Sequence, residues 1–299
     1  MNRKTALVTG ASGFTGRHMI AALKGRGYRV VGFGASCQDA DLSISCDLTD
    51  PVAVREAVLQ VSPDYVVHLA ALSFVAHGDA EAFYRVNVLG TLNLLEALAA
   101  LDAVPRKVLV ASSANVYGTP GIEVIDESVC PAPVNHYACS KLAMEHMVRT
   151  WFERLPIVIT RPFNYTGPGQ DERFLIPKIV GHFKRGAREI ELGNLDVSRD
   201  FSDVADVVAA YAALLESDTR SVTVNVCSGR ATSLREIIAK MNDIAGYEIE
   251  VRVNPAFVRA NEIPRLLGNN AVLAGLAGMT PQIKIDATLH RMFMDSGEA

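Results

Sequence analysis

The sequence predicts an α/β fold in which helices cover both faces of a doubly wound, mainly parallel sheet, with a smaller, discontinuous α/β substrate-binding domain beside it. Short apolar segments rich in β-branched residues alternate with longer segments in which apolar residues recur at helical spacing. The first apolar segment runs directly into a glycine-rich turn, and a helical segment follows the turn. This order is typical of the Rossmann βαβ unit, which has right-handed crossovers and binds its ligand at the carboxyl ends of the strands.

The composition is that of a chain with a large buried core. Hydrophobic residues make up 49% of the 299 residues, and the formal net charge is -4 with both signs mixed along the chain, which argues against nucleic acid as a partner. The five cysteines include no C-x-x-C pair, so neither a disulfide framework nor a zinc site is indicated. The longest purely apolar run, Val207 to Leu215, is less than half of the roughly 20 residues that a membrane-spanning helix needs. We expect a cytoplasmic protein that enters no membrane.

The glycine turn is the first candidate site. An expected strand, Thr5 to Thr9, is followed at once by Gly10, Gly13 and Gly16, and the next segment, Arg17 to Lys24, is helical. Glycines let the backbone turn tightly and approach a pyrophosphate, whose charge is favoured by the free N-H groups at the helix start. A glycine pattern alone is weak evidence, but the strand before it and the helix after it predict a dinucleotide site.

The choice between NAD and NADP stays open at the next strand, Tyr28 to Phe33. An acidic residue after this strand normally binds the adenosine ribose of NAD. Here the positions are Gly34, Ala35 and Ser36, which neither repel nor attract a 2'-phosphate. The next carboxylate, Asp47, is equally consistent with the adenine edge of the cofactor and with a helix cap or loop aspartate.

A further expected strand, Tyr65 to Leu69, ends in the small residues Ala70 and Ala71, which let the chain pass close to a cofactor. His68 in this strand is more consistent with a buried, hydrogen-bonded side chain than with a metal ligand. Asn87 interrupts the apolar side of the expected helix Glu81 to Leu101, where it either supports the active site or is a satisfied polar residue.

A serine, a tyrosine and a lysine form the candidate catalytic group. The expected strand Lys107 to Ala111 leads to Ser113, and Tyr137 and Lys141 lie four residues apart on an expected helix from about Asn135 to Arg154, hence on one face. The ammonium favours the phenolate, so we expect a pKa of Tyr137 drawn down toward neutrality. With Ser113 bound to the same substrate oxygen, this group suits carbonyl reduction by a nicotinamide. Taken alone, the tyrosine and lysine would be an ordinary surface pair.

Four motifs in the first half of the chain resemble those of the extended short-chain dehydrogenase/reductase superfamily, which contains nucleotide-sugar epimerases, dehydratases and reductases. They are T-G-A-S-G-F-T-G, H-L-A-A, S-S-A-N-V-Y-G and Y-A-C-S-K. The resemblance implies that Ser113 is the catalytic serine, Tyr137 the acid/base and Lys141 the ligand of the nicotinamide ribose. It also implies a cofactor site made of Gly10, Gly13, Phe14, Thr15, Gly16, Asp47, Leu48, Leu69, Ala70, Ala71, Tyr137 and Lys141.

Motifs in the second half resemble those of the GDP-4-keto-6-deoxy-D-mannose reductases that form GDP-D-rhamnose. They are R-P-F-N-Y-T-G-P-G-Q, L-I-P-K-I, L-D-V-S-R-D-F-S-D-V, N-V-C-S-G and R-A-N-E-I-P-R. The resemblance implies that the diphosphate is held by Asn164, Arg199 and Arg259, that Glu262 lies near the nucleoside, and that Ser73 and Ser113 touch the sugar. Arginine forks suit phosphate oxygens, although a surface ion pair explains either arginine equally well.

These observations predict two intertwined domains and one reaction. Residues 1–164 and 196–227 are assigned to the dinucleotide-binding domain, and residues 165–195 and 228–299 to the nucleotide-sugar domain. The expected reaction is the NAD(P)H-dependent reduction of the C4 ketone of a GDP-4-keto-6-deoxyhexose, by which GDP-4-keto-6-deoxy-D-mannose becomes GDP-D-rhamnose. The two long helices of the first domain could also pair across a two-fold axis, as in the proteins that the chain resembles, which predicts a homodimer.

Three other functions are compared with this one. A 4,6-dehydratase must also remove a proton and water, and the dehydratases of the superfamily that this chain resembles carry an acidic pair directly after the catalytic serine or threonine. This chain has Ala114 and Asn115 there, so elimination is disfavoured. A 4-epimerase with retained NAD uses the same three catalytic residues and is the runner-up. A redox-sensing protein without catalysis is the least favoured, because such proteins usually lose a catalytic residue or the glycines.

Overall fold

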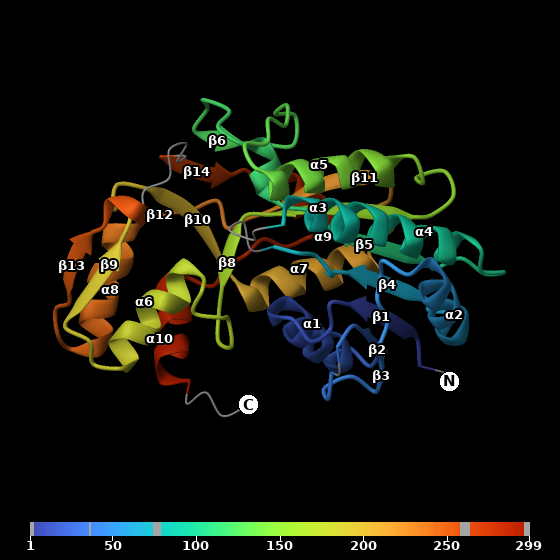
Figure 1. Cartoon of the computed structure of the whole chain (residues 1–299), viewed down its shortest axis with the longest axis horizontal. Coiled ribbons are helices and arrows are strands. Elements are labelled where there is room, and N and C mark those ends of the chain that lie inside the picture. Colours follow the sequence, from blue (N-terminus) through green and yellow to red (C-terminus); the bar gives the residue numbers. More distant parts are fainter. Residues whose placement is uncertain (1–2, 36, 74–78, 258–263, 296–299) are drawn as a thin grey trace.

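The structure is a computed structural model that describes residues 3–35, 37–73, 79–257 and 264–295. Its central feature is a seven-stranded sheet with the strand order β11-β7-β5-β4-β1-β2-β3, in which all neighbouring strands are parallel (Figure 1). The strands are β1 (Thr5–Thr9), β2 (Arg29–Phe33), β3 (Leu42–Ile44), β4 (Tyr65–His68), β5 (Lys107–Ala111), β7 (Ile157–Pro162) and β11 (Val222–Val226). The strand order reverses between β1 and β4, so the loops after these two strands meet at one edge.

Helices cover both faces of this sheet and form two apolar cores with it. On one face pack α1 (Phe14–Gly25), α7 (Val204–Glu216) and α9 (Ala271–Ala277). On the other face pack α2 (Pro51–Val61), α4 (Thr91–Ala99) and α5 (His136–Arg149). The predicted doubly wound Rossmann fold is therefore confirmed.

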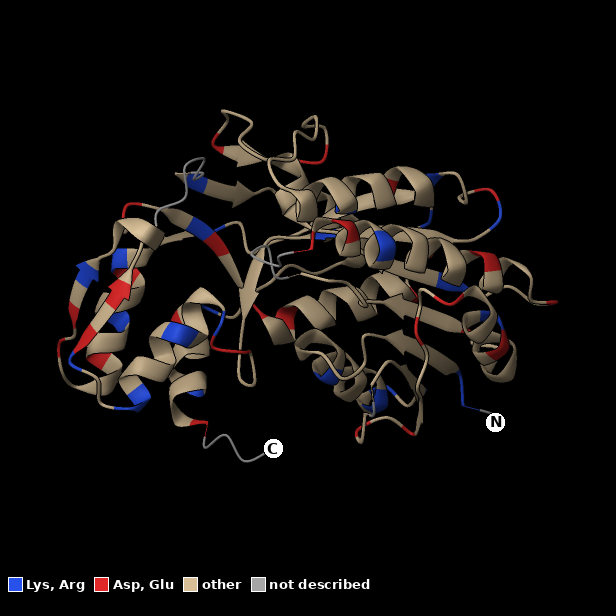
Figure 2. Ribbon diagram, in the orientation of Figure 1, with Lys and Arg blue, Asp and Glu red and all other residues tan. Residues whose placement is uncertain are grey.

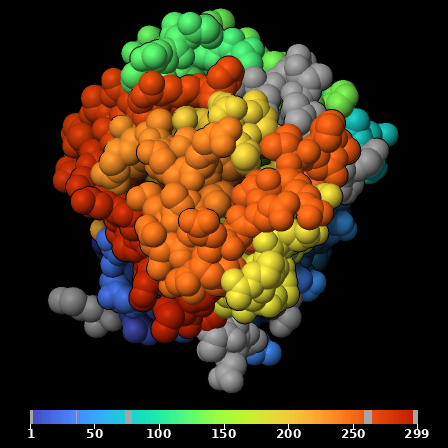
Figure 3. Space-filling view, turned by 90° about the vertical axis from the view of Figure 1, so that its left-hand side faces the viewer, coloured from blue at the N-terminus to red at the C-terminus, as the bar shows by residue number. Residues whose placement is uncertain are grey.

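A second layer of structure lies beyond the carboxyl edge of the main sheet. Its larger sheet has the order β12-β10-β14-β6, with β8 paired to β10, and a small parallel sheet joins β9 to β13. Helices α6, α8 and α10 share one apolar core with β9, and Figure 3 shows yellow, orange and red segments of this part side by side. The bounds are β6 (Val124–Ile125), β8 (Asn164–Thr166), α6 (Leu175–Lys184), β9 (Glu189–Leu192), β10 (Ser198–Asp203), β12 (Ala231–Ser233), α8 (Leu234–Ala245), β13 (Glu250–Val253), β14 (Arg265–Gly268) and α10 (Ile285–Met294), with a short 3-10 turn at Pro255–Phe257.

The domain division stays a prediction, but the pairing of the strands refines it at one point. Residues 196–227 were assigned to the dinucleotide-binding domain, and α7 and β11 within this segment do pack on or join the main sheet. By contrast β10, in the same segment, pairs with β8, β12 and β14. The chain thus leaves the second sheet at the end of β10, where α7 begins.

The two long predicted helices differ from the observed ones in detail. The predicted helix 81–101 consists of α3 (Ala80–Tyr84), a π-helical turn η1 (Arg85–Gly90) and α4. The predicted helix 135–154 is α5, which is capped by Asn135, whose Oδ1 accepts from the Ala138 N-H at 2.9 Å, and ends at Arg149. The pairing of these helices with those of a second copy stays a prediction.

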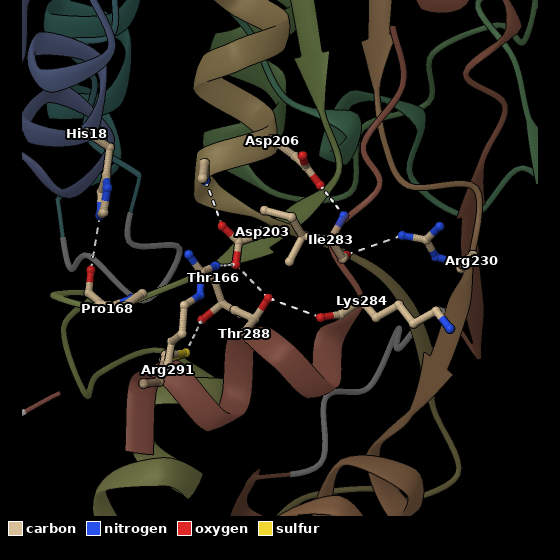
Figure 4. A network of polar contacts seen from close by, with 12 residues as sticks. His18, Thr166, Pro168, Asp203, Asp206, Arg230, Ile283, Lys284, Thr288 and Arg291 are labelled. Carbon is tan, nitrogen blue, oxygen red and sulfur yellow. Dashed lines mark hydrogen bonds and ion pairs between the residues drawn. The ribbon is translucent and has the colours of Figure 1, made fainter. Parts of the chain in front are cut away.

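Polar contacts fasten the C-terminal helix α10 to the start of α7 (Figure 4). The buried carboxylate of Asp203 accepts from the Ala205 N-H at 2.8 Å, from the Thr288 hydroxyl at 2.6 Å and from the Arg291 guanidinium. One turn along α7, Asp206 accepts from the Ile283 N-H at 2.7 Å. We call this set of contacts at Asp203 and Asp206 the α7–α10 latch.

The distribution of charges and the lengths of the helices match the expectations from the composition. Figure 2 shows Lys and Arg interspersed with Asp and Glu over the ribbon, with no single basic band. Over the described part of the chain, every helix falls short of the length and apolarity that crossing a bilayer requires.

Candidate active site

The glycine turn joins the ends of β1 and β4. Gly10 has a φ of +68°, which favours glycine, and a Cβ on it would lie 2.8 Å from the Ala70 nitrogen. Gly16 lies inside α1, where a Cβ would come 2.2 Å from the Gly10 carbonyl oxygen. Both glycines are therefore required by close packing of backbone, and Ala70 lies beside the turn.

The start of α1 has the properties that a dinucleotide pyrophosphate needs. Gly13 is the N-cap and supplies no capping side chain, and the first turn contains no acidic residue. The N-H groups and the dipole of this helix end are consequently available to an anion. Phe14 and Thr15 at this end contact Tyr165: the rings of Phe14 and Tyr165 stack with centroids 6.1 Å apart, and the two hydroxyls lie 2.8 Å apart. The residues present fit the predicted cofactor.

At the expected adenine end, Asp47 is exposed and Leu48 is buried. The Asp47 carboxylate accepts from the backbone N-H and the hydroxyl of Thr49, at 2.9 and 2.8 Å, and these bonds lower the pKa of Asp47. The contacts are those of a loop aspartate, the alternative that the sequence left open. Gly34 has a φ of +138°, and Ser36 lies outside the described residues.

A buried chain of hydrogen bonds lies beneath this turn and confirms the interpretation of His68. The Thr9 hydroxyl oxygen accepts from the Leu69 and Ala70 N-H groups at 3.2 and 3.1 Å, so its proton is directed to His68 Nδ1 at 2.7 Å. His68 Nε2 lies 2.8 Å from the Thr91 hydroxyl. Burial lowers the pKa of His68 to about 3, and the positive charge of Lys141 acts in the same direction. His68 is thus a neutral structural side chain that holds the loop after β4.

Ser113, Tyr137 and Lys141 converge at the carboxyl end of β5, where all three are buried. Ser113 caps the 3-10 turn η2 (Ala114–Tyr117), and its Oγ accepts from the Asn115 N-H at 3.2 Å. Lys141 Nζ donates to the Ala111 carbonyl oxygen at 2.8 Å. One strand end and one helix face therefore bring the three predicted catalytic groups together.

The predicted direction of the Tyr137 pKa is wrong. Burial raises the pKa of Tyr137 to about 12, against a smaller opposing effect of its hydrogen bond with Ser113. Burial also lowers the pKa of Lys141 to about 8, while the negative charge of Glu145 opposes this shift. The helical spacing suggested that attraction to the Lys141 ammonium would dominate, but removal of the phenol from water is the largest effect on the pKa of Tyr137. The phenol consequently stays protonated at neutral pH.

Asn87 joins the loop after β4 to α5, the helix that carries Tyr137 and Lys141. Its amide oxygen accepts from the Leu72 N-H at 2.9 Å, and its amide nitrogen donates to the Leu72 carbonyl at 3.1 Å and to the Ser140 hydroxyl at 3.0 Å. Ser140 in turn donates to the Tyr137 carbonyl at 2.8 Å. Of the two readings that the sequence left open, the contacts fit the one in which Asn87 supports the site.

The expected substrate residues are only partly brought together. Ser113, Asn115, Phe163, Asn164 and Leu266 help to line a hollow of about 30 Å³. Arg199 on β10 is paired with Leu266 on β14, so it lies one strand away from this hollow. Ser73 is exposed after β4.

Arg259 and Glu262 lie outside the described residues, as does any contact that they make.

Reasoning from the sequence missed Glu145 and Arg161, which form a buried ion pair directly behind the site. Arg161 Nη2 donates to Glu145 Oε2 at 2.6 Å, and Arg161 Nε donates to Oε1 at 2.9 Å. A signal was present, because Glu145 follows Lys141 by four residues on the same helix face. Nothing in the spacing shows that its partner is an arginine on a later strand.

The chain has relatives of known name over nearly its full length. GDP-6-deoxy-D-talose 4-dehydrogenase of Aggregatibacter actinomycetemcomitans is 38% identical over 272 residues, which span 91% of this chain and 90% of the relative. GDP-6-deoxy-D-mannose reductase of Pseudomonas aeruginosa is 37% identical over 301 residues, which span 96% of this chain and 95% of the relative.

Two solved structures share the fold closely. A candidate epimerase from Burkholderia cenocepacia J2315 is 49% identical with a TM-score of 0.92, and the match covers 97% of each chain. The structure of RMD from Pseudomonas aeruginosa, complexed with NADPH, is 35% identical with a TM-score of 0.85 and covers 97% of this chain and 96% of its own.

A family model identifies the class of protein to which the chain belongs. The model of the NAD dependent epimerase/dehydratase family matches residues 6–227. Together with the glycine turn at α1, this match confirms the predicted resemblance and the expectation of an enzyme that uses NAD or NADP. The chain belongs to the NAD dependent epimerase/dehydratase family, the extended branch of the short-chain dehydrogenases/reductases.

Proposed function

We propose that this enzyme reduces the C4 ketone of a GDP-4-keto-6-deoxyhexose with NADPH or NADH, and that GDP-4-keto-6-deoxy-D-mannose becomes GDP-D-rhamnose. The observation that carries the proposal is the convergence of Ser113, Tyr137 and Lys141 beside the hollow that Asn164 also lines. The names of the two relatives, each more than a third identical to this chain, support a GDP-linked 6-deoxyhexose as the substrate.

Each catalytic side chain has a role that its surroundings support. The hydride for C4 is what the reduced nicotinamide supplies when it is bound. Burial keeps the Tyr137 phenol protonated, so it can donate its proton to the new C4 hydroxyl. The Lys141 ammonium stabilises the resulting phenolate and binds the nicotinamide ribose, and Ser113 donates a hydrogen bond to the C4 oxygen.

The remaining assigned residues form the binding sites. We assign the diphosphate of the cofactor to the turn from Gly10 to Gly16, and the substrate diphosphate to Asn164, Arg199 and Arg259. We place the substrate between the part formed by residues 1–164 and 196–227 and the part formed by residues 165–195 and 228–299. Ser73 and Glu262 complete the proposed contacts to the sugar and the nucleoside.

A 4-epimerase is the second candidate, and the description of the 49% identical Burkholderia protein favours it. The same three side chains serve both reactions, which differ in the fate of the cofactor. An epimerase retains NAD and consumes none, whereas the proposed reductase oxidises one reduced nicotinamide for each sugar. Neither Ala114 nor Asn115 can act as a general acid or base, which disfavours the 4,6-dehydratase reaction.

The test supplies purified enzyme with GDP-4-keto-6-deoxy-D-mannose and either NADPH or NADH. We expect oxidation of the nicotinamide in step with sugar consumed, and GDP-D-rhamnose as the product in an NMR spectrum. GDP-6-deoxy-D-talose is the C4 epimer, so the same spectrum reads the stereochemistry of hydride delivery. Turnover with a UDP or dTDP sugar but none with the GDP sugar would overturn the proposed substrate, and bound NAD with no net oxidation would establish the epimerase.

The variant Tyr137→Phe tests the catalytic assignment. Loss of the proton donor should lower kcat by about 10²-fold to 10⁴-fold without a comparable change in KM. The matched control is Tyr28→Phe, which also removes a phenol hydroxyl. This hydroxyl donates to Glu216 at the end of α7 at 3.1 Å, so the kcat of the control should stay near that of the wild type. Near-native turnover by Tyr137→Phe would show that another group donates the proton.

A further inference from the structure

Glu145 carries a carboxylate that lies entirely inside the protein, immediately behind the candidate catalytic group. Its exposed fraction is 0%, and it follows Lys141 by one turn on α5. Taking an ionised carboxylate out of water costs several kcal/mol, so a buried one needs partners that offset this cost. Two neighbouring strands supply them.

The partners of Glu145 come from the strands on either side of the site. Ser112, at the end of β5, donates its hydroxyl to Glu145 Oε1 at 2.6 Å, and its backbone N-H donates to the Thr160 carbonyl at 2.7 Å. Arg161, on β7, makes two hydrogen bonds to the carboxylate and is 2% exposed. The carboxylate therefore joins β5, β7 and α5, and Ser112 directly precedes Ser113.

The Arg161 guanidinium is itself held from the other side. It lies 4.7 Å from the ring centroid of Tyr117, and the Tyr117 hydroxyl donates to Asn225 Oδ1 at 2.7 Å on β11. The orientation of the carboxylate is thus set by side chains from four neighbouring elements, which leaves it little freedom to turn.

The charges around Lys141 make Glu145 electrostatically important. The titratable groups that act on Lys141 or are acted on by it are Glu145 on α5 and His68 on β4, and Tyr137 lies one turn before Lys141 on α5. Burial keeps Tyr137 protonated and His68 neutral at neutral pH. Glu145 then supplies the negative charge that opposes the loss of the Lys141 proton, although Arg161 and, at 3.7 Å, Arg149 share that charge.

We propose that Glu145 is a positioning residue of the reductase: its buried carboxylate fixes Ser112, and with it Ser113, against α5 and places a negative charge one helical turn from Lys141. This inference rests on the function proposed above, because it assigns Glu145 a task in the same site. Glu145 itself touches neither substrate nor cofactor in this assignment.

The test is the variant Glu145→Gln, which keeps the shape of the side chain and removes its charge. NMR titration of ¹³C-labelled lysine side chains, with the Lys141 signal identified by its absence in Lys141→Arg, should show the Lys141 midpoint about one pH unit lower than in wild type. Activity needs the protonated amine, so it is present below the Lys141 pKa and lost as the pH rises through it. The alkaline limb of kcat should move down by the same amount.

Two controls separate this role from a purely structural one. Ser112→Ala removes a hydrogen bond to Glu145 but leaves its charge, so it should lower kcat without moving the Lys141 midpoint. Glu145→Gln leaves the buried Arg161 charge unpaired, which destabilises the fold. The double variant E145Q/R161M removes both charges and restores stability, and its Lys141 midpoint should fall by less than in the single variant, because the repulsion from an unpaired Arg161 is gone as well.

An unchanged Lys141 midpoint in a folded variant overturns the inference, whatever the loss of stability. The titration reads Lys141 without turnover, so it remains decisive even for an enzyme that proves inactive on the GDP sugar. Absence of turnover by the wild type refutes the proposed substrate, whereas a normal midpoint in Glu145→Gln refutes the role of Glu145.

Discussion

The protonation state of Tyr137 depends on where the residue lies rather than on which residue stands next to it. A phenol on an exposed helix, four residues from a lysine, would lose its proton more readily than free tyrosine. Inside this protein, burial reverses the shift and raises the pKa of Tyr137 to about 12. A protonated phenol suits the proposed reduction, in which the product oxygen gains a proton.

Gly118 offers a test of packing at the scale of one residue. It follows Val116-Tyr117 with a φ of +63°, and a Cβ on it would lie 1.9 Å from the Ala132 carbonyl oxygen. Gly118→Ala should lower the free energy of unfolding by at least about 2 kcal/mol, because backbone strain and a backbone clash add together.

The matched control is Gly121→Ala. Gly121 also has a positive φ, +72°, but a Cβ there meets nothing within 4 Å. Urea denaturation should therefore show a loss of only about 1 kcal/mol, from strain alone. Equal losses for the two variants would mean that the segment around Ala132 moves aside without cost.

At the scale of elements, the π-helical turn η1 explains why one predicted helix became three segments. The turn displaces the register of the helix at Asn87, and π turns are often found at functional sites. The side-chain amide of Asn87 can then bond both backbone groups of Leu72 and reach Ser140 on α5. The irregularity is thus what connects the loop after β4 with α5.

The variant Asn87→Ala tests this connection. It leaves the N-H and C=O groups of Leu72 without the amide that satisfies them, so we expect a loss of about 2–3 kcal/mol in unfolding free energy and a decrease of about 10-fold in kcat/KM. Leu89→Ala on the same turn is the control, since Leu89 is 52% exposed and should change both quantities little. A stable, fully active Asn87→Ala protein would show that the loop after β4 is held by other contacts.

The sequence was sufficient for the elements whose signals are local. The strand Thr5–Thr9 was predicted with its observed bounds, because a buried parallel strand is a continuous apolar run and a glycine turn marks its end. The meeting of Ser113, Tyr137 and Lys141 could be predicted for the same reason, since their motifs lie at a strand end and within one helical turn, while their catalytic role stays a prediction.

Contacts between residues far apart in the sequence could not be predicted from local patterns. The Glu145–Arg161 pair joins residues of α5 and β7, and β10 pairs with β14 more than 60 residues later, so neither leaves a local pattern. The direction of the Tyr137 pKa was wrong for a related reason: it depends on burial by the whole fold, which helical spacing does not report.

At the scale of the molecule, the α7–α10 latch ties the end of the chain to a helix of the main sheet. Asp203 is fully buried and caps α7, while its partner Arg291 has a side chain 46% exposed. The two partners should therefore contribute unequally. Asp203→Asn should lower the unfolding free energy by about 2 kcal/mol, because Thr288 and Arg291 both lose a charged acceptor.

Arg291→Gln is the matched variant from the exposed side of the latch. We expect it to cost at most about 1 kcal/mol, as for other half-exposed ion pairs, and to leave the bond between Thr288 and Asp203 in place. Both values can be measured by urea denaturation. A larger effect of Arg291→Gln than of Asp203→Asn would contradict the assignment of Asp203 as the central member.

The position of β11 in the main sheet has a consequence for how the chain is made. Its neighbour β7 ends at Pro162, but β11 begins only at Val222, after the first half of the second sheet has been synthesised. During this interval a nascent chain exposes the unpaired backbone of a strand that is fully buried in the finished fold, which is a template for association with other chains. Translation of residues 163–221 is thus the period in which the emerging protein most needs a chaperone.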